Sequence, residues 1–159
     1  MNPKNNKIAI IGMGYVGLPL AVALAKKNHV VGFDINKIRV NNLKRGIDQT
    51  KEILKNEIIN SKKLRFSDKI SDLSKCETYI ITVPTPVDKN NKPNLKPLLN
   101  ATKTISKVLS KNNLVIYEST VFPGATEELC GPILEKNSGF KINKNLYLGY
   151  SPERINPGD

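Results

Sequence analysis

Short apolar runs alternate along the chain with longer segments in which apolar residues recur at helical spacing. The runs have the length of strands, and the segments between them show the i, i+3, i+4 pattern of amphipathic helices. This alternation is typical of a parallel sheet that helices cover on both faces. Strands are expected at 7–12, 29–34, 64–66, 78–83, 114–117 and 146–150, and helices at 16–27, 36–44, 50–60, 95–109 and 123–135.

Capping and breaking residues indicate where several of these elements end. Asn36 can cap the helix that runs to Lys44, and Gly46 suits the end of that helix. Pro132 should kink the last helix, which should stop before Gly139. With right-handed crossovers, the pattern predicts an α/β fold with a doubly wound, mostly parallel six-stranded sheet and helices on both faces.

Length and composition favour one globular domain. The chain has 159 residues, 39% of them hydrophobic and 25% charged, which is ordinary for such a domain. No apolar run reaches the roughly 18 residues of a spanning helix. The segment 1–7 is polar, and the apolar run after it is short, broken by glycine and without a cleavage site. We therefore expect a cytoplasmic protein.

The chain is strongly basic, with a net charge of +11 at pH 7. Such a charge suits nucleic acid, anionic lipid or a phosphorylated ligand. The lysines are spread in ones and twos, without arginine clusters or interleaved aromatic residues, so a solvated basic surface is the simplest interpretation. Nucleic-acid and membrane partners are not expected, and attraction of nucleotide phosphates is the remaining use of the charge.

Two cysteines, Cys76 and Cys130, lie far apart in the sequence. They form no CxxC pair and have no cluster of histidines near them. Neither a disulfide framework nor a metal site is therefore expected, and both residues are predicted to be buried free thiols.

A glycine-rich turn follows the first predicted strand. Residues 12–17 read G-x-G-x-x-G and lead directly into a predicted helix. In a Rossmann-type site the first glycine permits the turn, the second lets a pyrophosphate approach the backbone, and the third lets the helix pack on the strand. The helix N-terminus then attracts the anion. We predict a dinucleotide contact from Gly12, Gly14, Tyr15, Val16 and Gly17.

An acidic residue stands where the second predicted strand ends. Asp34 follows Gly14 by twenty residues, a spacing at which a carboxylate can accept hydrogen bonds from both ribose hydroxyls. The same carboxylate would repel a 2′-phosphate, so the pattern favours NAD over NADP. The alternative is a glycine-rich turn that binds no dinucleotide, with Asp34 merely capping the next helix.

Read with their neighbours, these residues resemble the nucleotide-sugar dehydrogenases of the UDP-glucose/GDP-mannose dehydrogenase family. The similarity looks strongest to the branch that acts on UDP-N-acetylhexosamines. It spans nearly the whole chain. The matching blocks are IAIIGMGYVGLPLAVALA at 8–25, FDIN-x-x-R at 33–39, VPTP at 83–86, ESTVFPGAT at 118–126 and GYSPERINPGD at 149–159.

The resemblance implies cofactor contacts beyond the glycine turn. Asp34 and Arg39 match contacts to the adenosine ribose, and Thr85 matches a contact at the end of the fourth strand. Ser119 and Thr120 match a pair near the nicotinamide, where Thr120 also holds a catalytic water. The alternatives are a solvated helix residue for Arg39, a plain turn for Thr85, and caps of the helix that begins at Pro123 for Ser119 and Thr120.

The resemblance also implies a catalytic carboxylate. Glu153 matches the residue that assists proton transfer and the final hydrolysis at C6 of the sugar, and Arg154 matches a substrate-side position. The alternative is a surface Glu-Arg pair in a proline-bounded loop.

In such enzymes the CH2OH group of the sugar is oxidised twice to a carboxylate, with two NAD and a cysteine thiolate that holds the intermediate. Cys76 and Cys130 lie outside any such motif, so residues 1–159 are expected to form a single NAD-binding domain that is inactive alone. Its full-length protein would bind a UDP-sugar and form a homodimer or higher oligomer. Alternatives are a UDP-glucose or GDP-mannose dehydrogenase, a hydroxyacid or 6-phosphogluconate type dehydrogenase, and a stand-alone NAD-binding module.

Overall fold

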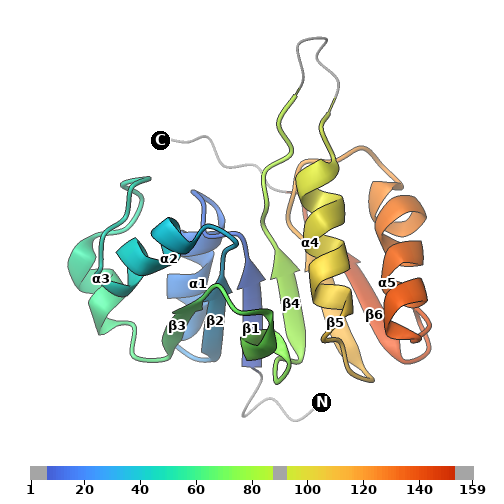
Figure 1. Cartoon of the computed structure of the whole chain (residues 1–159), viewed down its shortest axis with the longest axis horizontal. Helices are drawn as coiled ribbons and strands as arrows, with labels where there is room; N and C mark the ends of the chain where they lie inside the picture. Colours follow the sequence, from blue (N-terminus) through green and yellow to red (C-terminus); the bar gives the residue numbers. More distant parts are fainter. Residues whose placement is uncertain (1–6, 88–92, 153–159) are drawn as a thin grey trace.

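The computed structural model describes residues 7–87 and 93–152 of the chain. Its centre is a six-stranded sheet in the order β3-β2-β1-β4-β5-β6, and all five strand pairings are parallel (Figure 1). The predicted doubly wound α/β sheet is confirmed, and it is wholly rather than mostly parallel. The strands are β1 Lys7–Ile11, β2 His29–Phe33, β3 Leu64–Ser67, β4 Thr78–Ile81, β5 Asn113–Tyr117 and β6 Leu146–Tyr150.

The chain starts in the middle of the sheet and changes direction once. From β1 it moves outward through β2 to β3, and it then returns to place β4 on the other side of β1. The strand order therefore reverses between β1 and β4. In open parallel sheets a ligand crevice lies at this switch point, outside the carboxyl ends of the strands.

Helices cover both faces, as predicted. In Figure 1, α4 and α5 lie in front of the sheet and α1 lies behind it. The described helices are α1 Gly17–Ala25, α2 Lys37–Lys44, α3 Lys55–Asn60, α4 Lys96–Ser106 and α5 Gly131–Ser138, with a 3-10 turn η1 at Ile70–Leu73 and a π-helical turn η2 at Thr126–Cys130. Within the described segments, no helix combines the length and apolar character needed to cross a bilayer.

The alternating side chains of the strands build a separate core on each face. Ile8 and Ile10 of β1 pack with Leu18 of α1, whereas Ala9 and Ile11 face the side that contains Leu98 of α4. Because both faces are buried, the strands read as continuous apolar runs in the sequence. The two cores fix the position of β1, and with it the loop that leaves its carboxyl end.

The predicted helix at 50–60 is wrong in its first half. Only Lys55–Asn60 is helical. The preceding segment is a turn, because the Asp48 carboxylate accepts hydrogen bonds from the backbone N–H groups of Thr50, Glu52 and Ile53. A side chain that satisfies these donors competes with helical hydrogen bonding.

The last predicted helix also differs in detail. The helical chain starts at Thr126 with the π-helical turn, and Pro132 lies in the first turn of α5, where a missing N–H is tolerated. The π-helical turn runs into α5 without a break, so Pro132 follows directly after the junction between the two. α5 continues past Glu135 to Ser138 and ends, as predicted, before Gly139, which adopts a left-handed conformation with φ +76°.

Candidate dinucleotide site

The glycine turn lies at the carboxyl end of β1, at the reversal of strand order. Gly12 has φ +102°, which only glycine adopts without strain. A Cβ at Gly17 would overlap the carbonyl oxygen of Gly12, so the third glycine is required for helix α1 to approach the turn. At Gly14 an added Cβ would meet no atom within 4 Å, so this glycine faces open space. The described structure supplies no side-chain cap for the N-terminus of α1.

Thr82 fastens this turn to the neighbouring strand. The residue is buried just beyond β4, and its hydroxyl lies 3.1 Å from the Ile11 carbonyl oxygen and 2.9 Å from that of Gly12. The Thr82 N–H donates to the Ile11 carbonyl at 2.9 Å, which continues the β1–β4 ladder. Sequence reasoning did not select Thr82, although it directly precedes the VPTP segment.

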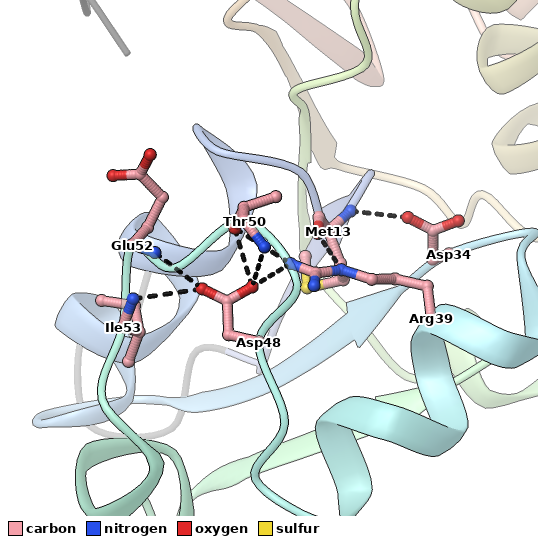
Figure 2. Close-up of polar contacts among 7 residues, drawn as sticks. All are labelled: Met13, Asp34, Arg39, Asp48, Thr50, Glu52 and Ile53. Carbon is pink, nitrogen blue, oxygen red and sulfur yellow. Dashed lines mark hydrogen bonds and ion pairs between the residues drawn. The ribbon is translucent and has the colours of Figure 1, made fainter. Parts of the chain in front are cut away.

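Asp34 lies at the end of β2 with its carboxylate turned toward the glycine turn (Figure 2). Its Oδ2 accepts the N–H of Met13 and its Oδ1 accepts the N–H of Asn36, both at 2.8 Å. A carboxylate has about four acceptor positions, so each oxygen keeps one for a ligand hydroxyl. The Asn36 side chain, not Asp34, caps α2 by accepting from Ile38 and Arg39 N–H groups. The alternative that Asp34 is the helix cap is therefore wrong.

Arg39 is buried against the same turn and is not a solvated helix residue. The residue is 6% exposed. Its Nε donates to the carbonyl oxygen of Met13 at 2.8 Å, and its Nη2 pairs with the Asp48 carboxylate at 2.7 Å (Figure 2). Its Nη1 is buried without a hydrogen-bond partner in the described structure. Asp34 and Arg39 thus hold opposite ends of one residue, Met13.

Two adjoining cavities follow the carboxyl edge of the sheet. The larger, about 560 Å³, reaches from the Asp34 and Arg39 side of the turn to α4. The smaller, about 100 Å³, is lined by Gly14, Tyr15 and Val16 and by the residues that follow β4 and β5. They share Gly14 and the segment Thr82, Val83 and Pro84. An elongated ligand can therefore lie across the switch point, with an anionic centre at the N-terminus of α1.

The predicted nicotinamide-side residues cross-link the loops after β4 and β5. The Thr85 hydroxyl donates to the Thr120 carbonyl at 2.7 Å, and the Ser119 hydroxyl donates to the Val83 carbonyl at 2.8 Å. Ser119 is buried, whereas Thr120 is exposed beside the smaller cavity. The following helical turn begins with Ala125 as its cap residue and has no side-chain cap. The alternative that Ser119 and Thr120 cap it is therefore wrong.

Glu153 and Arg154 lie outside the described residues. Two residues before Glu153 in the sequence, the Ser151 N–H donates to the Tyr117 carbonyl at 2.9 Å and continues the β5–β6 ladder.

Both cysteines are buried free thiols, as predicted. Burial raises the pKa of Cys76 to about 11, against which the charges of Lys7 and Arg65 act only in part, and burial likewise raises the pKa of Cys130. At neutral pH both are protonated and shielded, so neither is suited to act as a nucleophile. The described segments contain no group of three His, Cys, Asp or Glu side chains that could hold a metal ion.

Comparison with known proteins agrees with this geometry. Residues 6–159 match the model of the NAD binding domain of the UDP-glucose/GDP-mannose dehydrogenase family. The chain is 54% identical to a UDP-N-acetyl-D-glucosamine 6-dehydrogenase of Pseudomonas aeruginosa, over 98% of this chain and 37% of the relative. It is 52% identical to protein CapL of Staphylococcus aureus, over 98% of this chain and 36% of the relative.

Solved structures show the same fold. The structure of a UDP-D-ManNAc dehydrogenase from Pyrococcus horikoshii superposes with a TM-score of 0.88 at 34% identity, covering 96% of this chain and 37% of that one. The chain thus spans little more than a third of these relatives. With its glycine turn, its cavities at the strand switch point and a family match over residues 6–159, the chain belongs to the UDP-glucose/GDP-mannose dehydrogenase family as an NAD-binding domain.

Proposed function

We propose that this domain supplies the NAD side of the active site in an enzyme that oxidises a UDP-N-acetylhexosamine to the corresponding uronic acid for bacterial surface-polysaccharide synthesis. The observation that carries the proposal is the pairing of an open glycine turn with the Asp34 carboxylate, which both line one cavity. The choice of sugar is supported by relatives named UDP-N-acetyl-D-glucosamine 6-dehydrogenase at 54% and 52% identity.

Each described side chain has a separate task in this proposal. Asp34 binds the hydroxyls of the adenosine ribose, beside Arg39. The N-terminus of α1 and the backbone of 12–17 bind the diphosphate. Thr85, Ser119 and Thr120 shape the nicotinamide end, where the cross-links between their loops fix the floor of the smaller cavity. When bound, NAD accepts the hydride that leaves the sugar carbon.

The proposed roles at the sugar fall to residues near the end of the chain. Glu153 would move protons at C6 and assist hydrolysis, Thr120 would help hold the water, and Arg154 would contact the substrate. The buried thiols of Cys76 and Cys130 are unsuited to capture an aldehyde. The domain is therefore proposed to bind NAD without turnover by itself. The complete enzyme would carry the double oxidation, working as a homodimer or higher oligomer in the cytoplasm.

The alternatives to this proposal are another sugar nucleotide as substrate, or a module without a reaction. A UDP-glucose or GDP-mannose dehydrogenase would use the same cofactor site with a different sugar, and a stand-alone module would bind NAD without any partner reaction. The identity of 54% to a UDP-N-acetyl-D-glucosamine enzyme favours the first proposal, because a UDP-glucose dehydrogenase from Pyrobaculum islandicum is 25% identical.

Calorimetric titration of this chain with NAD tests the cofactor site. Saturable binding is expected, with a large loss of affinity in Asp34→Ala. Unaltered affinity in that variant would contradict the ribose role of Asp34. The substrate is tested on the full-length enzyme, which should form two NADH for each UDP-N-acetylhexosamine consumed and should react far more slowly as Glu153→Gln. Faster oxidation of UDP-glucose or GDP-mannose would favour an alternative.

A further inference from the structure

Asp48 is a buried carboxylate at the centre of five short contacts. Its side chain is 1% exposed, although its backbone lies nearer the surface. It accepts N–H groups of Thr50, Glu52 and Ile53 at 2.9–3.1 Å and the Thr50 hydroxyl at 2.7 Å, and it pairs with Arg39 at 2.7 Å (Figure 2). Burial raises the pKa of this carboxyl, but the hydrogen bonds from Thr50 and Arg39 outweigh burial and lower it below its ordinary value.

The partner of this carboxylate stands at the proposed ribose site. Arg39 lines the larger cavity together with Asp34, and both are hydrogen-bonded to Met13. Figure 2 shows the guanidinium lying between Met13 and Asp48, with Asp34 on the other side of Met13. In the described structure, Arg39 forms its ion pair with Asp48 and none with Asp34.

The charge balance at this end of the cavity follows from that pairing. Arg39 and Asp48 have side chains 8% and 1% exposed, so water screens their attraction weakly and the pair is close to neutral as a unit. The nearby charge that is left is the Asp34 carboxylate. Lys96, the other cation that lines this cavity, belongs to α4 and not to the Asp34 side. A 2′-phosphate entering beside Asp34 would therefore meet negative charge.

An unpaired arginine at this position would have the opposite effect. In related folds, an arginine near the end of the second strand accommodates the 2′-phosphate of NADP. Arg39 has a planar fork suited to that task, but its Nε donates to Met13 and its Nη2 pairs with Asp48, so that Nη1 is the nitrogen without a partner in the described structure.

We propose that Asp48 is a positioning residue that determines cofactor specificity through Arg39: by neutralising the guanidinium and tying it back, it keeps the ribose site selective against a 2′-phosphate. The inference rests on the proposed NAD site and extends it to a residue outside the glycine turn. Asp48 itself lines neither of the two cavities.

A purely structural role for Asp48 has a different consequence. If the carboxylate only held the turn at 48–53, its loss would weaken NAD and NADP binding by the same factor. If Asp48 instead offsets the positive charge of Arg39, its loss weakens NAD binding and strengthens NADP binding relative to NAD binding. The ratio of the two dissociation constants therefore separates the roles.

The experiment measures both dissociation constants by calorimetry at low ionic strength, for the wild-type chain and Asp48→Asn. We expect the NADP/NAD ratio of dissociation constants to fall by about tenfold, the size of one hydrogen bond to a charged group. Asp48→Ser, which keeps a hydroxyl to accept a backbone N–H, should show the same direction of change. Circular dichroism and thermal unfolding identify the variants that fold.

Two matched variants complete the test. Glu135→Gln removes the carboxylate of another ion pair, Lys141–Glu135, whose residues line neither cavity, and should leave the ratio unchanged. Arg39→Met/Asp48→Asn removes both charges and should restore a ratio close to that of the wild type. Equal weakening of both cofactors in Asp48→Asn and Asp48→Ser, or a lowered ratio that persists in the double variant, would overturn the inference while leaving the NAD site intact. Failure of the wild-type chain to bind NAD would instead overturn the proposed function.

Discussion

The hydroxyl of Thr82 lies 2.9 Å from the carbonyl oxygen of Gly12, so the end of β4 holds the turn that leaves β1. The bond spans the switch point of the sheet, where β1 and β4 are neighbours and the strand order reverses. It fixes the first glycine of the turn before a ligand is present.

Thr82→Val should therefore loosen the turn while keeping the shape of the side chain. The loss of the hydroxyl leaves the Gly12 carbonyl without this donor, and unfolding free energy should fall by about 1 kcal/mol. NAD affinity should fall with it. Urea denaturation and calorimetry measure the two effects. Ser61→Ala removes a comparable hydroxyl contact, to the Glu57 carbonyl, far from the turn and should leave NAD affinity unchanged.

Gly14→Ala should impair NAD binding alone, whereas Gly17→Ala should impair both stability and NAD binding. At Gly14 a methyl group meets open space, so the variant should keep the wild-type melting temperature but bind NAD much more weakly. At Gly17 a methyl group overlaps the Gly12 backbone, so both stability and binding should fall. Thermal unfolding with and without NAD distinguishes the two. Normal NAD binding by Gly14→Ala would show that the ligand does not approach this part of the turn.

Arg39→Met should destabilise the ligand-free domain strongly, because it leaves the buried Asp48 carboxylate without its counter-charge. A loss of about 3 kcal/mol or more is expected for breaking such a pair. Arg39→Met/Asp48→Asn should recover at least about 1 kcal/mol of that loss, which denaturant unfolding of all four members of the cycle would measure. Additive losses would mean that the two side chains do not interact energetically.

Cys76 should make stability depend on alkaline pH. The folded-state pKa of this thiol is raised to about 11 from an ordinary 9.0, so the folded chain holds the proton more tightly than the unfolded chain. The stabilisation is fully present below pH 9 and is lost as the pH rises toward 11. Between pH 9 and 11 the unfolding free energy of the wild type should therefore fall relative to that of Cys76→Ala. Iodoacetamide should label Cys76 only upon unfolding.

Local signals in the sequence predicted the strands, the cap at Asn36 and the place of the glycine turn correctly. Those features depend on residues close together in the chain. The helix expected from residue 50 failed because apolar spacing imitated an amphipathic face, yet Leu54 and Ile59 are 68% and 57% exposed and only Ile58 of α3 is buried. The turn there is instead held by the carboxylate of Asp48, and a pattern of apolar residues carries no information about such a polar contact.

In the candidate site, too, some residues could be placed from local sequence signals and others could not. Asp34 and the glycines could be placed because a strand end and a turn bring them together. The buried position of Arg39 could not, since its contacts to Met13 and Asp48 join residues 26 and 9 positions away. Thr82 bonds to a residue 70 positions earlier, which only the pairing of β1 with β4 makes close.

The close approach of Gly17 to Gly12 limits how this domain can diversify. The surface offered to a diphosphate there is main chain, and a side chain at the third glycine would separate α1 from the turn. Substitution can therefore alter the loops after β4 and β5, which line the smaller cavity, without rebuilding the glycine turn. Variation in this part of the domain is thus confined to side chains of the surrounding loops, while the main chain of the turn has to be inherited unchanged.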